Sequence, residues 1–167
     1  MVAAIIGKEV EETILRRLSY NKETGSVIWL DGKRAGRKIY NTSCDGYHRL
    51  KILGSTYYLH RVCWFLHYRE WPTSHLDHVN GDKTDNRIVN LRVASSTQNS
   101  ANRSLAVNNT TGHKGVVYLE NISKYMVRVG SSPRVLVGYF ENLDDAAKAY
   151  NDAAKELYGE YARLNNV

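Results

Sequence analysis

Hydrophobic and polar residues follow two different periods along this chain, and each change of period marks a change of element. Runs with strand character are separated by glycine-containing turns, as in antiparallel hairpins, at 26–30, 47–53 and 56–59. Val10, Ile14 and Leu18 follow a helical period, which predicts a first helix that ends near 21–25. Apolar residues within 59–70 predict a second helix, which ends at the sequence EWP.

The last third of the chain has the clearest pattern. Three strand-like runs at 114–119, 124–130 and 134–140 precede an apolar stripe at helical spacing, formed by Leu143, Ala146, Ala147, Tyr150, Ala154 and Leu157. Asn142 is a suitable N-cap for this helix, and Gly159 is a suitable stop. The polar segment 104–113 predicts a boundary between a domain at 1–107 and a domain at 108–167. Together these patterns predict an α+β fold.

Composition narrows the class of protein. Hydrophobic residues make up 43% of the chain and charged residues 24%, which is typical of a globular protein. No apolar run reaches the roughly 18 residues of a membrane span, and the N-terminus lacks the basic flank of a secretory signal. Cys44 and Cys63 form no CxxC pair, which argues against a zinc ribbon or a disulfide scaffold and favours the cytoplasm.

The distribution of charge indicates a polyanionic partner. The net charge is +6, and residues 1–107 carry 16 Lys and Arg against 10 Asp and Glu. The segment 108–140 has a net charge of +3, and the segment 141–167 has a net charge of −3. Basic strands backed by an acidic helix would present one positive face to phosphates. The basic run DGKRAGRK at 31–38 would add to such a surface.

Candidate chemistry gathers in the stretch LDHVNGDKTDNRIVNLRVASSTQN, at 76–99. Its pattern predicts a strand, a polar loop, a second strand and then a helix capped by Ser96 or Thr97. Carboxylate and amide oxygens are hard ligands suited to magnesium or manganese, and a histidine near neutrality can activate water. A metal ion and a histidine together supply what phosphodiester hydrolysis needs. Asn80, Asp82 and Asp85 also permit a calcium loop, but the spacing and bidentate acid of an EF-hand are missing.

The same stretch resembles the HNH homing endonucleases of the phage type, whose fold is the ββα-metal unit, with the motif at 76–103. The resemblance extends upstream through TGSVIW, GYHRLKI and LHRVCWFLHYREWP. It implies that Asp77 is a metal ligand, that His78 is the general base and that Asn90 fixes the loop and orients the histidine. It also implies that Asn99 is the second metal ligand, with Asn102 as the alternative, and that the cation is Mg²⁺ or Mn²⁺. Paired cysteines are missing, so no zinc is expected.

The segment 113–165 resembles the Apetala-type domain of plant ethylene-response factors, through KGV, GYF, DAAKAYNDAA and the terminal LN. That resemblance implies a three-stranded antiparallel sheet, packed on one helix, that lies in the major groove of double-stranded DNA. By position, the residues that would face DNA are Lys114, Tyr118, Tyr125, Arg128 and Arg134.

We therefore expect a metal-dependent endonuclease that cuts double-stranded DNA at chosen sites, by nicking or by double-strand cleavage, as a monomer or a homodimer. A cytoplasmic protein encoded by a phage or mobile element fits these features. The alternatives are a sequence-specific DNA-binding regulator with an inactive nuclease scaffold and a nuclease directed to RNA or to nucleic-acid structure. His60 is open to two interpretations, as a contact to DNA phosphates or as a cap of the preceding strand.

Overall fold

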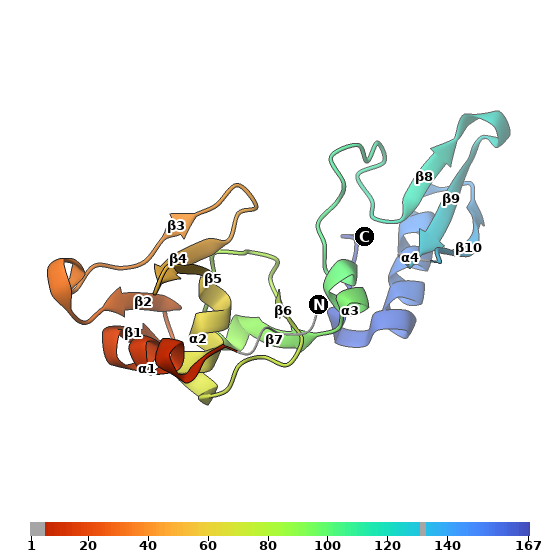
Figure 1. The fold of residues 1–167 in the computed structure, drawn as a ribbon. Helices are drawn as coiled ribbons and strands as arrows, with labels where there is room; N and C mark the ends of the chain where they lie inside the picture. The colour runs from red at the N-terminus through yellow and green to blue at the C-terminus, as the bar shows by residue number, and fades with distance from the viewer. Residues whose placement is uncertain (1–5, 131–132) are drawn as a thin grey trace. The chain divides into compact units, whose positions relative to one another are not determined.

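The computed structural model describes residues 6–130 and 133–167 of the chain, and it confirms the α+β class (Figure 1). The chain divides into two compact units, Met1–Ala94 and Ser95–Val167, each of which is described by itself. The predicted functional boundary at 107 lies further along the chain than this structural division. Among the described residues, no helix is both long and apolar enough to cross a membrane.

The first unit contains three small antiparallel sheets and two longer helices (Figure 1). Its elements are α1 (Lys8–Arg17), β1 (Leu18–Asn21), β2 (Ser26–Trp29), the 3₁₀ helix η1 (Gly32–Arg34), β3 (Asn41–Thr42), β4 (His48–Ile52), β5 (Ser55–Tyr58), α2 (Leu59–Tyr68), β6 (His75–His78), the 3₁₀ helix η2 (Ile88–Asn90) and β7 (Leu91–Ala94). The sheets pair β1 with β2, β3 with β4 and β5, and β6 with β7. One hydrophobic core joins α1, α2 and these sheets, and it includes Cys63.

The first helix ends earlier than its apolar spacing predicts. Leu18 does not belong to α1 but begins β1, where it pairs with Trp29 of β2. The turn that follows is built by Asn21, whose side-chain oxygen accepts hydrogen bonds from the next backbone N–H groups, and by Gly25 at a φ of 70°. Leu18 is buried in either arrangement, so its position in the sequence could not distinguish the helix from the strand.

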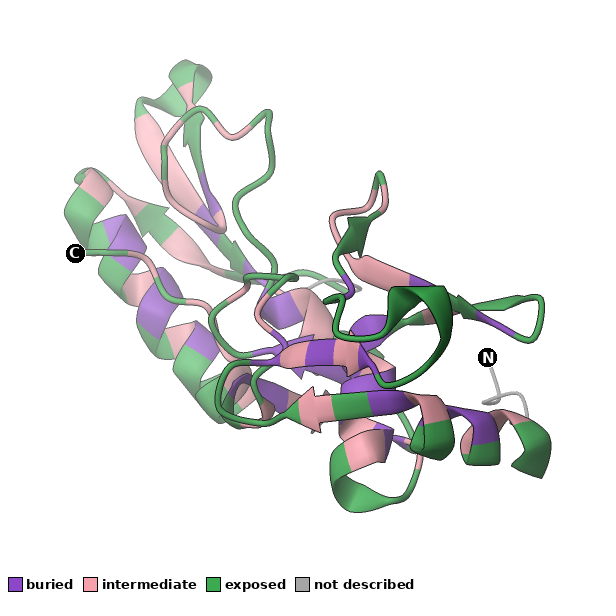
Figure 2. Ribbon diagram, turned by 90° about the vertical axis from the view of Figure 1, so that its left-hand side faces the viewer, coloured by how far each residue is buried: buried purple, intermediate pink, exposed green. Residues whose placement is uncertain are grey.

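The second unit is a three-stranded antiparallel sheet with one long helix packed on it (Figure 1). Its elements are α3 (Ser96–Ala101), β8 (Val116–Leu119), the 3₁₀ helix η3 (Glu120–Ile122), β9 (Lys124–Val129), β10 (Val135–Phe140), α4 (Leu143–Tyr158) and the 3₁₀ helix η4 (Gly159–Tyr161). Buried residues recur on one side of α4, as the apolar stripe predicts (Figure 2), but Leu157 at the end of the predicted stripe is 51% exposed. Asn142 caps this helix through hydrogen bonds from the N–H groups of Asp144 and Asp145, and Gly159 ends it.

Two polar residues fasten the end of the chain to this sheet. The side chain of Asn165 accepts a hydrogen bond from the N–H of Lys114 at 2.6 Å, and Asn151 of α4 pairs with the backbone of Asn165. Next to Lys114, Gly115 has a φ of 74°, and a Cβ there would lie 2.2 Å from the ring of Tyr150. The fold therefore requires glycine directly before β8, because any side chain at this position would displace the core residue Tyr150.

Candidate functional site

The hairpin β6–β7 carries the predicted catalytic pair. In its register, Asp77 faces Arg92 and His78 faces Leu91. Neighbouring side chains of a strand point to opposite faces, yet both Asp77 and His78 are buried, at 5% and 3% exposure. Protein therefore covers both faces of the strand at this end, and the two side chains have separate surroundings.

Asp77 forms an ion pair with Arg92, its cross-strand neighbour. Nε and Nη2 of Arg92 lie 3.0 and 2.8 Å from Oδ2 of Asp77. Both side chains are largely shielded from water, so removal of either partner would leave the other charge buried and unpaired at this contact. Arg92 thus holds the carboxylate in place, and the sequence did not point to it.

His78 is oriented by a residue of the loop between β6 and β7. Its Nε2 lies 3.2 Å from Oδ1 of Asn86, whose side chain is almost fully buried. An amide oxygen only accepts hydrogen bonds, so this contact requires the proton on Nε2 and leaves Nδ1 unprotonated in the neutral ring. Burial lowers the pKa of His78, and the hydrogen bond to Asn86 partly offsets this effect. The arrangement gives a neutral imidazole with one defined basic nitrogen.

Asn86 is itself held by the hairpin β1–β2. The hydroxyl of Tyr20 donates a hydrogen bond of 2.8 Å to the carbonyl oxygen of Asn86. Gly25 lies so close that a Cβ there would be 2.8 Å from the carbonyl carbon of Asn86 and 2.6 Å from the N of Arg87. The N-terminal hairpin is therefore part of the support of His78.

Asn90 braces the same loop, while the residue that contacts His78 is Asn86. Its Oδ1 accepts a hydrogen bond of 3.0 Å from the N–H of Asn80, and its Nδ2 donates one of 2.8 Å to the carbonyl oxygen of Asp85. Asn90 is 5% exposed, so these bonds are shielded from water. It ties together the start and the end of the loop that carries Asn86, and a direct part in catalysis remains a prediction.

The acidic side chains of this loop form local turns. Oδ1 of Asp82 accepts hydrogen bonds from Thr84, and Asp85 forms an ion pair with Arg87. Among residues 6–130 and 133–167, no three His, Cys, Asp or Glu side chains gather as a metal site would require. In the described residues, the acidic side chains of the candidate calcium loop therefore do not form such a cluster.

Aromatic rings surround His78 on its other sides. The ring of His60 lies edge-on to it with a centroid distance of 5.2 Å, and the ring of Tyr47 lies 5.8 Å away. Burial, and then the charges of His78 and Arg61, lower the pKa of His60 to about 3. His60 is therefore neutral at physiological pH and packs beside His78, which neither of the two interpretations of this residue foresaw.

The predicted second ligand lies on α3, in the second unit. Ser95 caps α3 in a reciprocal capping box with Gln98, so the predicted caps Ser96 and Thr97 are wrong by one or two residues. Asn99 is half-buried in the middle of this helix. Asn102, the alternative ligand, forms the C-cap and is 8% exposed.

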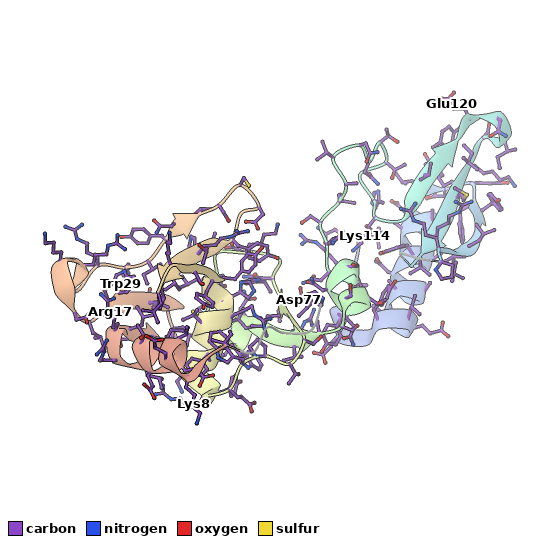
Figure 3. The ribbon with its side chains drawn as sticks, in the orientation of Figure 1. Lys8, Arg17, Trp29, Asp77, Lys114 and Glu120 are labelled. Atoms are coloured by element: carbon purple, nitrogen blue, oxygen red, sulfur yellow. The ribbon has the colours of Figure 1, made fainter. Side chains whose placement is uncertain are left out.

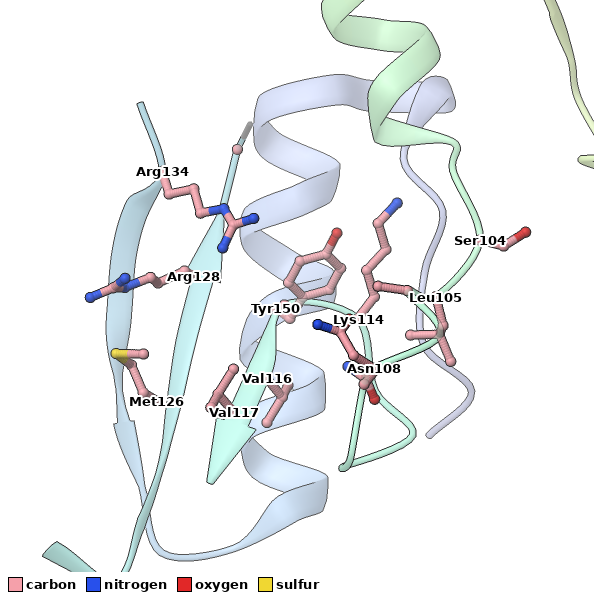
Figure 4. Close-up of a pocket in the computed structure, with 14 residues that line it drawn as sticks. Ser104, Leu105, Asn108, Lys114, Val116, Val117, Met126, Arg128, Arg134 and Tyr150 are labelled. Carbon is pink, nitrogen blue, oxygen red and sulfur yellow. The ribbon is translucent and has the colours of Figure 1, made fainter. Parts of the chain in front are cut away.

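Two regions carry the predicted DNA-contacting cations. In the first unit, the guanidinium groups of Arg17 and Arg34 lie 5.2 and 5.8 Å from the ring centre of Trp29, next to the basic run 31–38 (Figure 3). In the second unit, Arg128 is exposed on β9. Arg128 and Arg134 both line one cavity of this unit (Figure 4).

Three of the predicted DNA contacts lie elsewhere. The ammonium group of Lys114 donates hydrogen bonds to the carbonyl oxygens of Ala101, the last residue of α3, and of Arg103, and burial lowers its pKa to about 8. Tyr118 pairs with Tyr125 across the strands, and Tyr125 packs against the core under α4. The tyrosines therefore belong to the α4 side of the sheet, not to the face of Arg128, because side chains alternate along β9.

The comparisons with known proteins agree with this site. Residues 57–101, which include α2 and the hairpin β6–β7, match the family of HNH endonucleases. This segment is similar to HNH endonuclease domains. An uncharacterized HNH endonuclease of Acanthamoeba polyphaga mimivirus is 32% identical over 96 residues, which are 56% of this chain and 48% of that relative. The match thus spans about half the length of the viral relative. No solved structure matches.

Proposed function

We propose that this HNH domain is a metal-dependent endonuclease that hydrolyses phosphodiester bonds in double-stranded DNA. The observation that carries the proposal is the fixed geometry of His78, whose Nε2 contacts Asn86 at 3.2 Å within the segment that matches HNH endonucleases. Asn86 orients the ring of His78, burial lowers its pKa, and the adjacent Asp77 is a buried carboxylate; together these features support a catalytic role.

The chemistry follows from the protonation state of His78. Its unprotonated Nδ1 takes a proton from water, and the hydroxide oxygen attacks the phosphorus in line with the leaving 3′ oxygen. The P–O bond to that oxygen breaks, which leaves a 5′ phosphate and a 3′ hydroxyl once the leaving oxygen has gained a proton. Asn86 would keep the ring in the productive tautomer as the positive charge develops on it.

The residues present fit a hard divalent cation. Asp77 would supply a buried carboxylate oxygen, and the family resemblance implies an amide oxygen of Asn99 as the second ligand. So few protein ligands suit Mg²⁺, or Mn²⁺ in its place, because such an ion keeps several waters and binds substrate phosphates. When bound, the ion would stabilise negative charge on the phosphate and on the leaving oxygen.

DNA would be held by the basic run 31–38 and by the sheet β8–β10. We propose that this sheet and α4 form an Apetala-type domain that directs cleavage to chosen sites, as in homing endonucleases, by nicking or double-strand cutting. The net charge of +3 over 108–140 and the exposed Arg128 support it. A phage or mobile-element origin is part of the proposal, supported by the viral relative.

A second candidate function is a sequence-specific DNA-binding regulator with an inactive nuclease scaffold. The observation that favours it is the ion pair of Asp77, because Arg92 already engages one oxygen of the carboxylate that a cation would need. Cleavage separates the two functions, whereas salt-dependent DNA binding is common to both.

Supercoiled plasmid incubated with the full chain and Mg²⁺ tests the proposal. Wild type should give relaxed or linear product, EDTA should prevent it, and His78→Ala should abolish it. His75→Ala is the matched control, because His75 lies on the same strand but is exposed. Intact plasmid with both Mg²⁺ and Mn²⁺, on DNA that includes the surroundings of its own gene, would favour the regulator.

A further inference from the structure

The face of the sheet turned away from α4 is apolar. Met126 on the central strand β9 pairs with Val117 of β8 and with Tyr139 of β10, and Leu136 pairs with Arg128. Cross-strand partners point to the same side of a sheet, so these five side chains share one face. We call Val117, Met126, Leu136 and Tyr139 the apolar row.

Three of the four side chains in the apolar row are exposed, and Met126 is partly exposed. Val117, Leu136 and Tyr139 are 48%, 48% and 49% exposed. On the opposite face, Val127 and Val129 are buried against α4. A contiguous apolar surface of this kind on a small unit marks a contact with another molecule.

Cations surround the apolar row. Arg128 lies within the same face, and Arg134 precedes β10. Met126, Val117 and both arginines line a cavity of about 490 Å³, whose other wall is the polar segment 104–109 (Figure 4). The strands of the basic segment 108–140 thus combine an apolar centre with cationic groups, which fits a polyanion that also offers apolar contacts.

Duplex DNA is a polyanion, and one of its bases, thymine, also offers an apolar group. Three strands spaced about 4.8 Å apart present a face about 10 Å across, which matches a major groove about 12 Å wide. Among the base edges in that groove, the 5-methyl group of thymine is the apolar one, and aliphatic side chains contact it. We propose that the apolar row recognises thymine methyl groups in the major groove while Arg128 and Arg134 bind the flanking phosphates. This inference rests on the proposed DNA binding by the sheet.

Removal of single methyl groups tests the inference. Wild type in EDTA, which prevents cleavage, first selects its ligands from a pool of random 20-base-pair duplexes. In the selected duplexes, deoxyuridine then replaces thymidine at random positions, so that only methyl groups are lost. Bound and free DNA are separated and sequenced. We expect deoxyuridine to be depleted from the bound fraction at a few clustered positions, by about fourfold for each methyl group that the row buries.

Variants assign the effect to the apolar row. Val117→Thr with Leu136→Thr should remove the depletion at those positions. Leu157→Thr is the matched control, because Leu157 is 51% exposed on α4, away from this face, and it should keep the wild-type pattern. Depletion that persists in the double variant would overturn the inference.

Two further outcomes separate this inference from the proposed function. Wild type that binds DNA but shows equal amounts of thymidine and deoxyuridine at every position would refute methyl recognition and leave DNA binding intact. If Arg128→Ala with Arg134→Ala binds the selected duplexes as tightly as wild type, the sheet is not the DNA-binding surface. That result would overturn the proposed role of the sheet, and the inference with it.

Discussion

Asn86→Ala removes the amide oxygen that lies 3.2 Å from Nε2 of His78. Asn86 is 2% exposed, so bulk water does not readily replace that oxygen. A buried donor that loses its partner costs about 1–3 kcal/mol. For a unit of this size, about 1 kcal/mol lowers the Tm by roughly 4–8 °C. We therefore expect a Tm lower by roughly 4–24 °C and a fold that persists, because Tyr20 still binds the backbone of residue 86.

The effect on catalysis should exceed the effect on stability. Without Asn86, the imidazole ring can adopt either tautomer and can rotate, so the proton acceptor is no longer held in one position. We expect kcat to fall about 10- to 100-fold, as for other losses of a supporting residue, while KM for DNA changes little. Plasmid cleavage at a temperature at which the variant is folded measures both parameters.

Asn80→Ala is the control for that experiment. Asn80 is an exposed amide of the same loop, and its Nδ2 donates a hydrogen bond of 2.9 Å to Asp85. Its kcat should stay within about threefold of wild type. The proposed role of Asn86 would be refuted by an unchanged kcat in Asn86→Ala, or by an equal loss in Asn80→Ala.

Three further predictions follow from the packing around His78. Because burial lowers the pKa of His78, cleavage should persist below pH 6.5 and fall only at lower pH, which a pH–rate profile of kcat would show; a midpoint at or above 6.5 would contradict this. His60 takes up a proton near pH 6.5 only in the unfolded chain, so the free energy of unfolding should decrease as the pH falls from 6.5 towards 3. Acid-denaturation curves should show a shallower decrease for His60→Gln. Gly25→Ala should cost at least about 1–2 kcal/mol in urea unfolding and also lower kcat, because its Cβ displaces the segment that carries Asn86; an unchanged midpoint would contradict the contact.

The repeating parts of the fold were predictable from sequence, because local period determines them. The helix α4 shows its cap, its stripe and its stop within 18 residues. The strand β1 was missed because Leu18 satisfies both the helical period and the buried position of a strand, and only its pairing with Trp29 decides between them. Pairing between segments is a tertiary effect that a local pattern does not contain.

The site was predictable where its residues follow one another in the chain. Asp77 and His78 stand together in the motif, and Asn90 closes the same loop. Arg92 could have been found from the hairpin, because it is the cross-strand partner of Asp77 once the register is known. The packing of His60 against His78 brings together residues 18 positions apart on different elements, and no local signal indicates it.

The assignment of Tyr125 to the DNA-facing side was avoidable. Tyr125 is two residues from Val127 and four from Val129, so a period of two places it with these core valines. The resemblance to the Apetala-type domain implied a DNA contact for Tyr125, whereas the alternation of side chains along β9 puts Tyr125 on the face that packs against α4. For Lys114, the hydrogen bonds to the carbonyl groups of Ala101 and Arg103 depend on tertiary structure, and the sequence alone gave no sign of them.

The central claim is that His78 is the base of a metal-dependent nuclease. Its most direct test is the single-turnover cleavage rate of plasmid DNA at saturating protein and Mg²⁺, for wild type and His78→Ala, together with the DNA affinity of both proteins in EDTA. We expect the rate to fall by at least about 100-fold with DNA affinity unchanged. Equal rates for the two proteins, or a loss of affinity that accounts for the loss of rate, would contradict the claim.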